Sequence, residues 1–376
     1  MHSLLKNIFG FVRREAVLSI ALLCALLSML AVPPDAAYAG YIDLRVLCLL
    51  FCLMAVVAGL QQCGLFLVLA QRLLAGRKQL RLLYLLLVLL PFFSSMLVTN
   101  DVALITFVPF TVLVLSRIGR SDALIRIVVL QTLAANLGSI ATPVGNPQNL
   151  FLYSYYALPI GNFLRVMLPL AGISLLALCA AALAARHETI EVEFREWEHI
   201  VHPRLFLLFC GLFLLCLLSV VHVLHYAILT TIVTLCLLLF ARRSFQRVDY
   251  ALLATFVCFF IFAGNIGRIE AVREALELLT GRSAYLTGLL VSQVISNVPA
   301  AVLLSGFTDN WQGLLAGVDV GGLGTPIASL ASLISLKLYL KAENASLPRF
   351  LLVFTVTNLV GLILLSAGVA LFGLLD

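Results

Sequence analysis

Two pairs of short polar motifs interrupt an otherwise apolar chain, and each pair joins an asparagine motif to a downstream Thr-Pro step. The first pair consists of residues 99–103 (TNDVA) and 138–150 (GSIATPVGNPQNL), and the second of residues 296–300 (SNVPA) and 317–332 (GVDVGGLGTPIASLAS). Polar side chains and prolines are unfavourable at membrane depth unless they line a cavity or lie buried in protein. The repeated pairing therefore indicates a transporter built from two repeats that share a polar site.

The two motif pairs match at several positions in the same order. Asn100 aligns with Asn297, Gly138 with Gly321, Thr142-Pro143 with Thr325-Pro326, and Asn149 with Ser332. Proline lacks the N–H that continues a helix, so each Thr-Pro step predicts a helix break. A broken helix presents free carbonyls and half-helix N-termini, and asparagine adds donors and an acceptor. We interpret these residues as ion and substrate ligands; the alternative is two ordinary proline kinks in packed helices.

Asp101 and Asp319 are the two acidic residues that we place inside the membrane, because the others fall in predicted loops, at helix ends or in interfacial segments. A carboxylate at membrane depth must be protonated, paired with a cation or exposed to water. Both are therefore candidates for proton or cation coupling, with a carboxylic acid hydrogen-bonded between helices as the alternative. No Lys or Arg lies within residues 127–164 or 283–336. An anionic substrate would have to be met by a bound cation, helix dipoles and side-chain amides.

The composition places the chain in a membrane. Of its 376 residues, 62% are hydrophobic and 11% are charged, which is too few charges to cover a soluble surface. The formal charge of +6, from 24 Lys and Arg against 18 Asp and Glu, lies between apolar segments. Charges in such loops indicate how the helices are oriented in the membrane, and their distribution is not typical of nucleic-acid binding. The nine cysteines lack CxxC spacing and the six histidines lack metal-ligand spacing, so we expect reduced packing cysteines and no histidine metal site.

The first apolar segment, residues 16–32, follows Lys6, Arg13 and Arg14 and ends in an alanine-rich stretch. This pattern is similar to that of a secretory signal peptide. We expect an uncleaved first transmembrane helix instead, because the many later apolar segments need no cleavable leader. The N-terminus is expected on the cytoplasmic side.

Residues 82–115 form an apolar segment of unusual length. No basic residue lies between Arg81 and Arg117, and the sequence SSMLVTND divides the segment into arms of about 12 and 15 residues, too short to cross a bilayer comfortably. Both outer ends are basic, which places them on one side of the membrane. We predict a re-entrant helical hairpin with Asn100 at its tip, followed by a broken helix over about residues 127–158.

The second half repeats this arrangement. Residues 284–308 form an apolar pair of arms around SNVP, and a second broken helix is expected over about residues 313–336. Counting spans from a cytoplasmic N-terminus, the second hairpin opens on the opposite side from the first. The predicted fold is an all-α polytopic membrane protein with about 10–11 transmembrane helices. It consists of two inverted repeats, residues 1–185 with N-terminal scaffold helices and residues 205–376.

A polar linker over residues 186–204 joins the two predicted repeats. We interpret it as an interfacial connector anchored by Trp197, with a regulatory or partner-binding helix as the alternative. The segment EAVREALELL, residues 270–279, is expected to be a helix lying on the membrane surface.

At these motifs the chain resembles the ion transporter superfamily that contains divalent anion/sodium symporters, citrate carriers, arsenite efflux permeases and sodium/proton antiporters. In the sodium/dicarboxylate branch each hairpin tip reads Ser-Asn-Thr, with a hydroxyl residue four positions before it. The resemblance implies two sodium sites, which take in Ser95, Thr99, Asn100 and Ala141 in the first half and Ser292, Ser296, Asn297 and Gly324 in the second. It also implies that Thr142-Pro143 and Thr325-Pro326 lie beside the substrate, and that hairpins and broken helices move together as an elevator.

This chain departs from the dicarboxylate pattern at the third tip residue. Asp101 and Val298 stand where that branch has threonine, so two hydroxyls expected at substrate carboxylates are absent. The Asn-Asp tip and the Asp before the second Thr-Pro step are more similar to the arsenite permease branch. Proton coupling through Asp101 is the corresponding expectation.

The predicted function is secondary active transport of an inorganic oxyanion, an arsenite-like solute or a carboxylate, coupled to a sodium ion or a proton. The expected substrate-binding residues are Asn100, Asp101, Thr142, Pro143, Asn297, Thr325 and Pro326, and the coupling residues are Asp101 and Asp319. A sodium/proton antiporter is the alternative within the same class. A passive channel and an intramembrane aspartyl protease, with Asp101 and Asp319 as its dyad, are the alternatives from other classes.

No enzymatic activity and no organic cofactor are expected. The expected partners are a small ion or anion and membrane lipid, together with a second copy of the chain in a homodimer; nucleic acid is not expected. The expected location is the bacterial cytoplasmic (inner) membrane, which the chain would cross many times.

Overall fold

The structure is a computed structural model that describes residues 10, 15–185, 187–194 and 196–375. Lys6, Arg13 and Arg14, which the orientation prediction uses, lie outside the described residues. The elements of the first half are α2 (Ala16–Ala31), α3 (Tyr38–Tyr41), α4 (Leu44–Gln62), α5 (Leu65–Leu74), β1 (Gly76–Gln79), α6 (Leu80–Ser95), α7 (Asn100–Arg117), η1 (Ser121–Ala123), α8 (Leu124–Ser139), α9 (Pro147–Tyr155) and α10 (Ile160–Leu183). Those of the second half are β2 (Thr189–Val192), α11 (Pro203–Val220), α12 (Tyr226–Phe240), η2 (Arg242–Arg247), α13 (Tyr250–Ile266), α14 (Glu270–Arg282), α15 (Ala284–Ile295), α16 (Asn297–Leu304), η3 (Ser305–Phe307), α17 (Trp311–Gly321), α18 (Leu330–Tyr339) and α19 (Leu347–Leu371).

The chain folds as an all-α polytopic membrane protein. Within the described residues, α4, α7, α10, α11 and α19 are each long and apolar enough to cross a membrane alone. Helices α13 and α14 would add a sixth span if counted together, but they are bent by 101° at the break between them. Most of the remaining helices are apolar but shorter. The count of about 10–11 spans therefore stays a prediction, because it depends on how short helices are combined.

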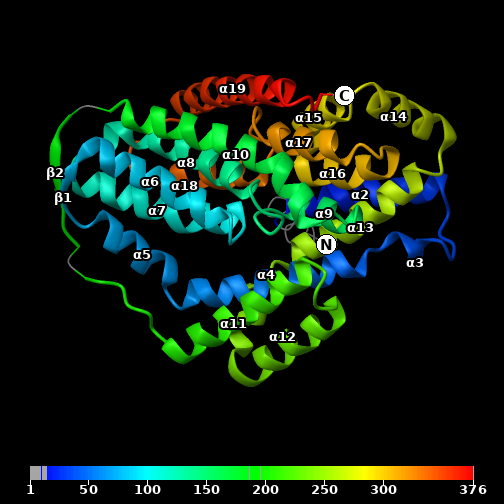
Figure 1. The fold of residues 1–376 in the computed structure, drawn as a ribbon, viewed down its shortest axis with the longest axis horizontal. Coiled ribbons are helices and arrows are strands. Elements are labelled where there is room, and N and C mark those ends of the chain that lie inside the picture. The colour runs from blue at the N-terminus through cyan, green and yellow to red at the C-terminus, as the bar shows by residue number, and fades with distance from the viewer. Residues whose placement is uncertain (1–9, 11–14, 186, 195, 376) are drawn as a thin grey trace.

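The helices form two groups (Figure 1). Helices α6 to α10 and α15 to α19 pack together as a large upper body in this view, and α4, α11 and α12 lie below it. Helix α2 packs along α13, and α4 packs along α11 and α12. The polar motifs thus lie in the upper body, while the lower helices flank it.

The order of elements recurs in the two halves. In each half a helix pair (α6–α7, α15–α16) is followed by an interrupted helix (α8–α9, α17–α18) and then by a long helix (α10, α19). The packing is exchanged between halves, because α7 contacts α18 and α16 contacts α9. An internal twofold relation would produce this exchange, but the opposite orientation of the two repeats stays a prediction.

Close helix packing beside the first break depends on small residues. A Cβ atom at Gly138, in α8, would overlap the carbonyl of Phe92 in α6. A Cβ atom at Gly321, at the equivalent place in α17, would lie 2.9 Å from the Cα atom of Leu289 in α15. In lipid, where apolar burial gives little preference for helix contact over lipid contact, such close approach is what holds helices together.

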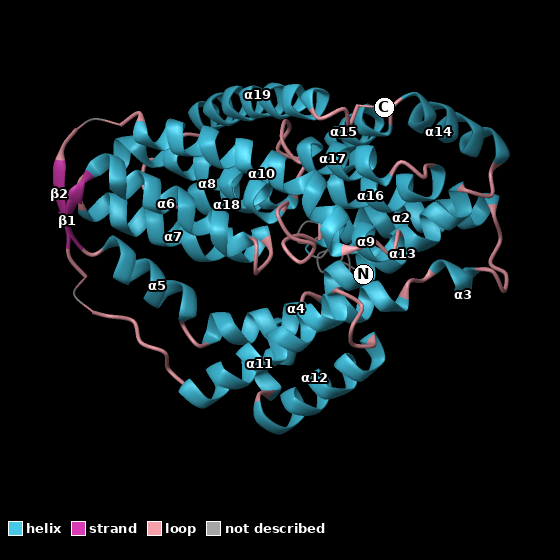
Figure 2. Cartoon of the chain, viewed as in Figure 1, coloured by secondary structure: helices cyan, strands magenta, loops and turns pink. Residues whose placement is uncertain are grey.

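The linker between the halves contains a strand that the sequence interpretation missed. Residues Thr189–Val192 pair antiparallel with Gly76–Gln79, the segment directly before the first helix pair, as Figure 2 shows. An ion pair between Arg120 and Glu188 lies beside this ladder. No helix forms in residues 187–194 or 196–202, so the alternative of a partner-binding helix receives no support from the described part of the linker.

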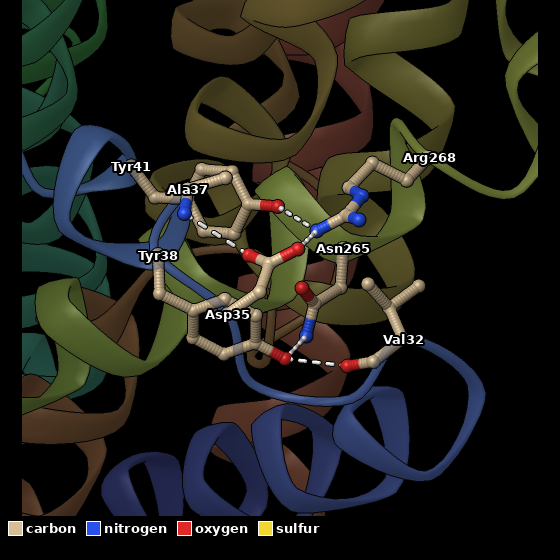
Figure 3. Close-up of polar contacts among 7 residues, drawn as sticks. All are labelled: Val32, Asp35, Ala37, Tyr38, Tyr41, Asn265 and Arg268. Atoms are coloured by element: carbon tan, nitrogen blue, oxygen red, sulfur yellow. Dashed lines mark hydrogen bonds and ion pairs between the residues drawn. The ribbon is translucent and has the colours of Figure 1, made fainter.

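A polar network joins the end of α2 and helix α3 to the end of α13 (Figure 3). The Arg268 guanidinium is 2.8 Å from the Asp35 carboxylate and 3.3 Å from the Tyr41 hydroxyl, to which it donates. The hydrogen bond from Arg268 lowers the pKa of Asp35 below its usual value. The pair contributes only when Asp35 is charged, and the contribution disappears as the pH falls through that lowered pKa. Both side chains are partly exposed, so we expect a small effect on stability.

The buried part of the same network is carried by Asn265, in the last turn of α13. Its Nδ2 donates to the Ser28 hydroxyl at 2.9 Å and to the Tyr38 hydroxyl at 2.8 Å. Tyr38 in turn donates to the carbonyl of Val32 at 2.6 Å. Helix α2 of the first half and helix α13 of the second half are therefore fixed to each other by hydrogen bonds.

Replacing Gly138 tests the packing of α6 against α8. We expect Gly138→Ala to reduce the free energy of unfolding by about 1–3 kcal/mol, because the added methyl group overlaps the Phe92 carbonyl. The matched control is Gly172→Ala in α10, where no atom lies within 4 Å of an added Cβ. That change should be neutral or stabilising by up to about 1 kcal/mol through helix propensity. Thermal unfolding of the detergent-solubilised variants measures both; equal melting temperatures would contradict the packing argument.

Candidate functional site

Each hairpin tip is hydrogen-bonded to the break of the interrupted helix in its own half. The backbone N–H of Asn100 donates to the carbonyl of Gly145 at 3.2 Å, and that of Asn297 donates to the carbonyl of Ala328 at 3.0 Å. Each asparagine is the first residue of its helix, and its Oδ1 accepts from the next backbone N–H at 3.0 Å. The two asparagines expected at the tips therefore hold equivalent places in the structure.

The Thr-Pro steps lie where the helices are interrupted. Thr142 and Pro143 lie between α8 and α9, and Thr325 and Pro326 lie between α17 and α18. The Thr142 hydroxyl donates to the carbonyl of Met96 at 2.5 Å, and the Thr325 hydroxyl donates to the carbonyl of Gln293 at 3.2 Å. The threonines thus bind the unwound segments to the ends of α6 and α15. The predicted helix breaks at the two Thr-Pro steps are confirmed, while the assignment of these residues as ion and substrate ligands stays a prediction.

A buried amide connects the first hairpin to the second break. Asn136, in the last turn of α8, accepts at its Oδ1 from the Asn100 amide at 3.0 Å and from the Ser329 hydroxyl at 3.1 Å. Ser329 directly precedes α18 and follows Ala328, which accepts from Asn297. Through Asn136, the two hairpin tips belong to one connected hydrogen-bond network.

Asp319 makes the reciprocal connection from the second half to the first. It lies in the last turn of α17, at the place that Asn136 has in α8, two residues before the aligned glycine. Its Oδ1 accepts from the Gln148 amide at 3.1 Å and from the Asn146 amide at 3.4 Å. Asn146 precedes α9 as Ser329 precedes α18, and its own Oδ1 accepts from the N–H of Asn149. Each interrupted helix therefore uses its last turn to bind the break of the other half.

These residues form what we call the central cluster: Asn100, Asn136, Asn146, Gln148, Asn149, Asp319, Ser329 and Ser332. All of them are buried. Several of their polar atoms have no hydrogen-bond partner in the described protein, namely Asn136 Nδ2, Asp319 Oδ2, Ser332 Oγ and both polar atoms of Asn149. Because unpaired buried polar groups are rare and unfavourable, they mark a site where further groups can bind.

The expected sodium ligands of the first half surround the first break. Ser95 is buried and its hydroxyl donates to the carbonyl of Phe92 at 2.9 Å. Thr99 directly precedes α7, and Ala141 lies in the unwound segment after α8. The structure therefore brings the end of α6, the hairpin tip and the first break together through Asn100 and Thr142.

The expected sodium ligands of the second half surround the second break in the same way. The Ser292 hydroxyl donates to the carbonyl of Gly288 at 2.7 Å, and the Ser296 hydroxyl donates to the carbonyl of Ala328 at 3.2 Å. Ser296 has φ = 75° and Gly324 has φ = 102°, a region that non-glycine residues rarely adopt. The second tip is thus held in a strained conformation next to the break.

Asp101 follows Asn100 of the central cluster, but no hydrogen bond in the described structure joins its side chain to the cluster. It lines a cavity of about 420 Å³ between the first hairpin and the flanking helices, together with Gln61, Arg247 and Asp249. Its Oδ1 is buried without a partner in the described protein. No hydrogen bond in the described structure joins Asp101 to Asp319, so the two acids that we grouped as coupling residues have different surroundings.

The sequence interpretation missed Asn136, Asn146 and Gln148. A signal for the last two was present, because Asn146, Gln148 and Asn149 concentrate amides in a stretch with no charged residue. Asn136 occupies the motif position of Asp319, so extending the alignment by two residues would have found it. No local sequence pattern predicted the hydrogen bonds from Ser329 to Asn136 and from Asn146 to Asp319, which join the two halves.

Comparisons with known proteins show which family and which transporters the chain is similar to. The family model described as "Citrate transporter" matches residues 8–311. The chain is 32% identical over 301 residues to the "Uncharacterized transporter MJ0456" of Methanocaldococcus jannaschii, covering 78% of this chain and 81% of that protein. It is 33% identical over 306 residues to the "Inner membrane protein YbiR" of Escherichia coli, covering 79% and 80%. A shorter match of 39% identity over 160 residues, 41% of this chain and 32% of the relative, is to the "Silicon efflux transporter LSI3" of Oryza sativa.

Asn136→Ala tests the bridge between the halves. The change leaves the Asn100 amide and the Ser329 hydroxyl without their acceptor, so we expect a loss of about 1–3 kcal/mol in the free energy of unfolding. The control is Asn358→Ala, because the Asn358 side chain is also buried but donates only to Phe354 in its own helix. Thermal unfolding should separate the two variants. Equal destabilisation would mean that Asn136 contributes no more than an ordinary buried amide.

Proposed function

The chain belongs to the citrate transporter family, and from this premise we propose that it is a secondary active transporter that moves an anion or a weakly acidic solute, coupled to a sodium or proton gradient. The candidate substrates are a carboxylate such as citrate, an inorganic oxyanion, or a weakly acidic solute such as arsenite or silicic acid. Silicic acid is included because one relative is named a silicon efflux transporter.

The reciprocal central cluster is the observation that carries this proposal. Two interrupted helices meet with buried amides, a carboxyl group and a hydroxyl whose polar atoms are partly unpaired. Such groups at the meeting point of two broken helices suit a small polar or charged solute. Burying unpaired polar groups is unfavourable in free energy, so a protein whose interior served packing alone would not be expected to contain them.

Helix ends and amides support recognition of an anion. Helix α9 begins after Asn146 and helix α18 begins after Ser329, and both residues belong to the central cluster. The N-terminus of a helix presents unpaired N–H groups and a positive dipole end to an anion. Asn136 and Asn149 add side-chain N–H groups without a partner in the described protein. The cluster contains no Lys or Arg, so these dipoles and amides would carry the recognition.

Asp319 supports the coupling part of the proposal. A charged Asp319 would repel an anion in the central cluster, because one of its carboxyl oxygens has no partner among the described residues. Binding a proton or a cation at that carboxyl group removes the repulsion. Anion binding and cation binding would then favour each other, as symport requires.

Asp101 gives the sodium/proton antiporter its support as the second candidate. Its carboxyl group lines the cavity that also contains Arg247 and Asp249, so a proton and a sodium ion could compete for it there. The aspartyl protease receives no such support, since its two proposed catalytic acids lie in different surroundings.

The elevator motion is supported by two cavities between the polar helices and the flanking helices. The cavity that contains Asp101 lies between the first hairpin and α4, which are also joined by a hydrogen bond from Gln61 to Thr106. A second cavity, of about 460 Å³, is lined by residues of α3, α9, α13 and α16 and by the segment after α16, with Tyr41, Tyr155 and Ser305 among them. We propose that the hairpins and interrupted helices move together past the flanking helices. Dimerisation, a bacterial cytoplasmic membrane and a cytoplasmic N-terminus are parts of the same proposal.

Transport by Asn100→Ala and Asn297→Ala tests the site. Each variant loses the amide whose Oδ1 accepts from the second N–H of a hairpin arm at the tip, so we expect at least a tenfold lower uptake with normal membrane insertion. Uptake of labelled citrate, arsenite or silicic acid into proteoliposomes is measured under an imposed sodium or pH gradient, with Asn358→Ala as the control. Wild-type uptake in both tip variants would remove the site assignment. Which gradient drives uptake identifies the coupling ion.

The role of Asp101 is tested by Asp101→Asn, which keeps the size of the side chain and removes its titration. We expect the pH dependence of transport to flatten while expression changes little, because the side chain lines a cavity and makes no side-chain hydrogen bond in the described structure. Transport rates across a pH series, normalised to the amount of inserted protein, provide the measurement. A profile identical to that of the wild type would exclude a protonation role.

A further inference from the structure

Gln293 has its side-chain amide against the carbonyls of the second break. It lies in the last turn of α15, next to Ser292. Its Nε2 donates to the carbonyl of Gly321 at 2.7 Å and to that of Leu323 at 2.9 Å, while its Oε1 accepts from the N–H of Thr325 at 2.9 Å. One side chain therefore binds three backbone groups that the end of α17 leaves without helical partners.

The local backbone is shaped around this amide. Gly324 has φ = 102°, and a Cβ atom at this position would overlap the Gln293 Oε1. A glycine is thus required both by the backbone conformation and by the space that the amide fills. The unwound segment after α17 therefore has a backbone conformation that fits the Gln293 side chain.

The first half has no equivalent amide. Met96 holds the place of Gln293, since it follows Ser95 and precedes the tip asparagine by the same distance in sequence. The backbone carbonyl of each residue accepts a hydrogen bond from the threonine hydroxyl of the break in its own half. A methionine has no N–H to donate, and no described side chain donates to the carbonyls of Gly138 or Ile140, which correspond to those of Gly321 and Leu323. The two breaks therefore differ in what their carbonyls face.

The carbonyls of an unwound helix are ligands for a small cation. The N–H groups of a primary amide carry partial positive charge and bind the same oxygens. The amide also occupies space next to them, and its N–H groups would repel an approaching cation. An amide at this place satisfies the carbonyls in the way that a bound sodium ion would.

We propose that the Gln293 amide takes the place of a cation in the second half, so that any sodium ion bound by this protein is confined to the first break. The inference deepens the proposed function and rests on it in treating the two breaks as the ion-binding elements. It reassigns Ser292, Ser296, Asn297 and Gly324 from a sodium site to an internally satisfied break. It leaves Ser95, Thr99, Asn100 and Ala141 as the ion site.

Gln293→Glu provides the main test. A carboxylate cannot donate to the carbonyls of Gly321 and Leu323, and it adds a cation ligand at the same place. We expect the melting temperature of the purified, detergent-solubilised chain to rise by several degrees more than that of the wild type when sodium chloride replaces choline chloride. Gln293→Met, which copies the first half, should gain a smaller sodium dependence.

The control for the charge change is Gln71→Glu. Gln71 is also buried; its Nε2 donates to the carbonyl of Glu196 at 3.3 Å and its Oε1 accepts from the N–H of Glu198 at 2.7 Å. These backbone groups belong to the linker and not to an interrupted helix, so a carboxylate there should not create a sodium dependence. A folded Gln293→Glu variant with the sodium dependence of the wild type would overturn the proposal.

A second measurement keeps the proposal testable if the Gln293 variants do not fold. Any sodium-dependent stabilisation of the wild type should be lost in Asn100→Ala and kept in Asn297→Ala. Its loss in Asn297→Ala, with or without a loss in Asn100→Ala, would overturn the proposal. These measurements need no substrate, so they stand even if every transport assay fails; absent transport would count against the proposed function only.

Discussion

The need to satisfy backbone groups where two helices are interrupted inside a membrane protein governs the whole arrangement. Carbonyl and N–H groups freed by a break cannot turn to lipid. Here each break is held by its own hairpin, through the tip N–H and through a threonine hydroxyl. The same needs also explain the small residues beside the breaks, because only a close approach of helices brings the hairpin backbone within hydrogen-bonding distance. The polar side chains of the site are therefore the same groups that satisfy the backbone where the helices are interrupted.

The two halves are similar in layout but differ in chemistry. Asn136 and Asp319 hold equivalent places, yet one is an amide and the other an acid, and Met96 stands where the second half has Gln293. Asp319 and Gln293 both belong to the second half, but the carboxyl group of Asp319 binds residues of the first break, while the amide of Gln293 binds the second break. The carbonyls of the second break are thus satisfied by an amide that the first break lacks among the described residues.

Much of the fold could be predicted because apolar runs and helix breakers have local causes. The first apolar segment, residues 16–32, coincides with α2 (Ala16–Ala31), and the Thr-Pro steps mark real interruptions. The short strand pair could not be predicted, since Gly76–Gln79 and Thr189–Val192 are too short and too charged to show a strand pattern, and they pair across the first half. Asn136 was missed because its importance comes from partners distant in sequence. Gln293 was missed because a single glutamine carries no pattern.

The exchange of packing partners between the halves has a consequence for biogenesis. Helix α2 is fixed to α13, α7 packs on α18, and α9 packs on α16. When only the first half has been synthesised, α2, α7 and α9 lack the helices of the second half on which they pack. The first half is then a partly folded intermediate in the bilayer. The fold is therefore completed only when helices of the second half pack against those of the first. Chain truncation after the linker would leave a species exposed to quality-control proteases.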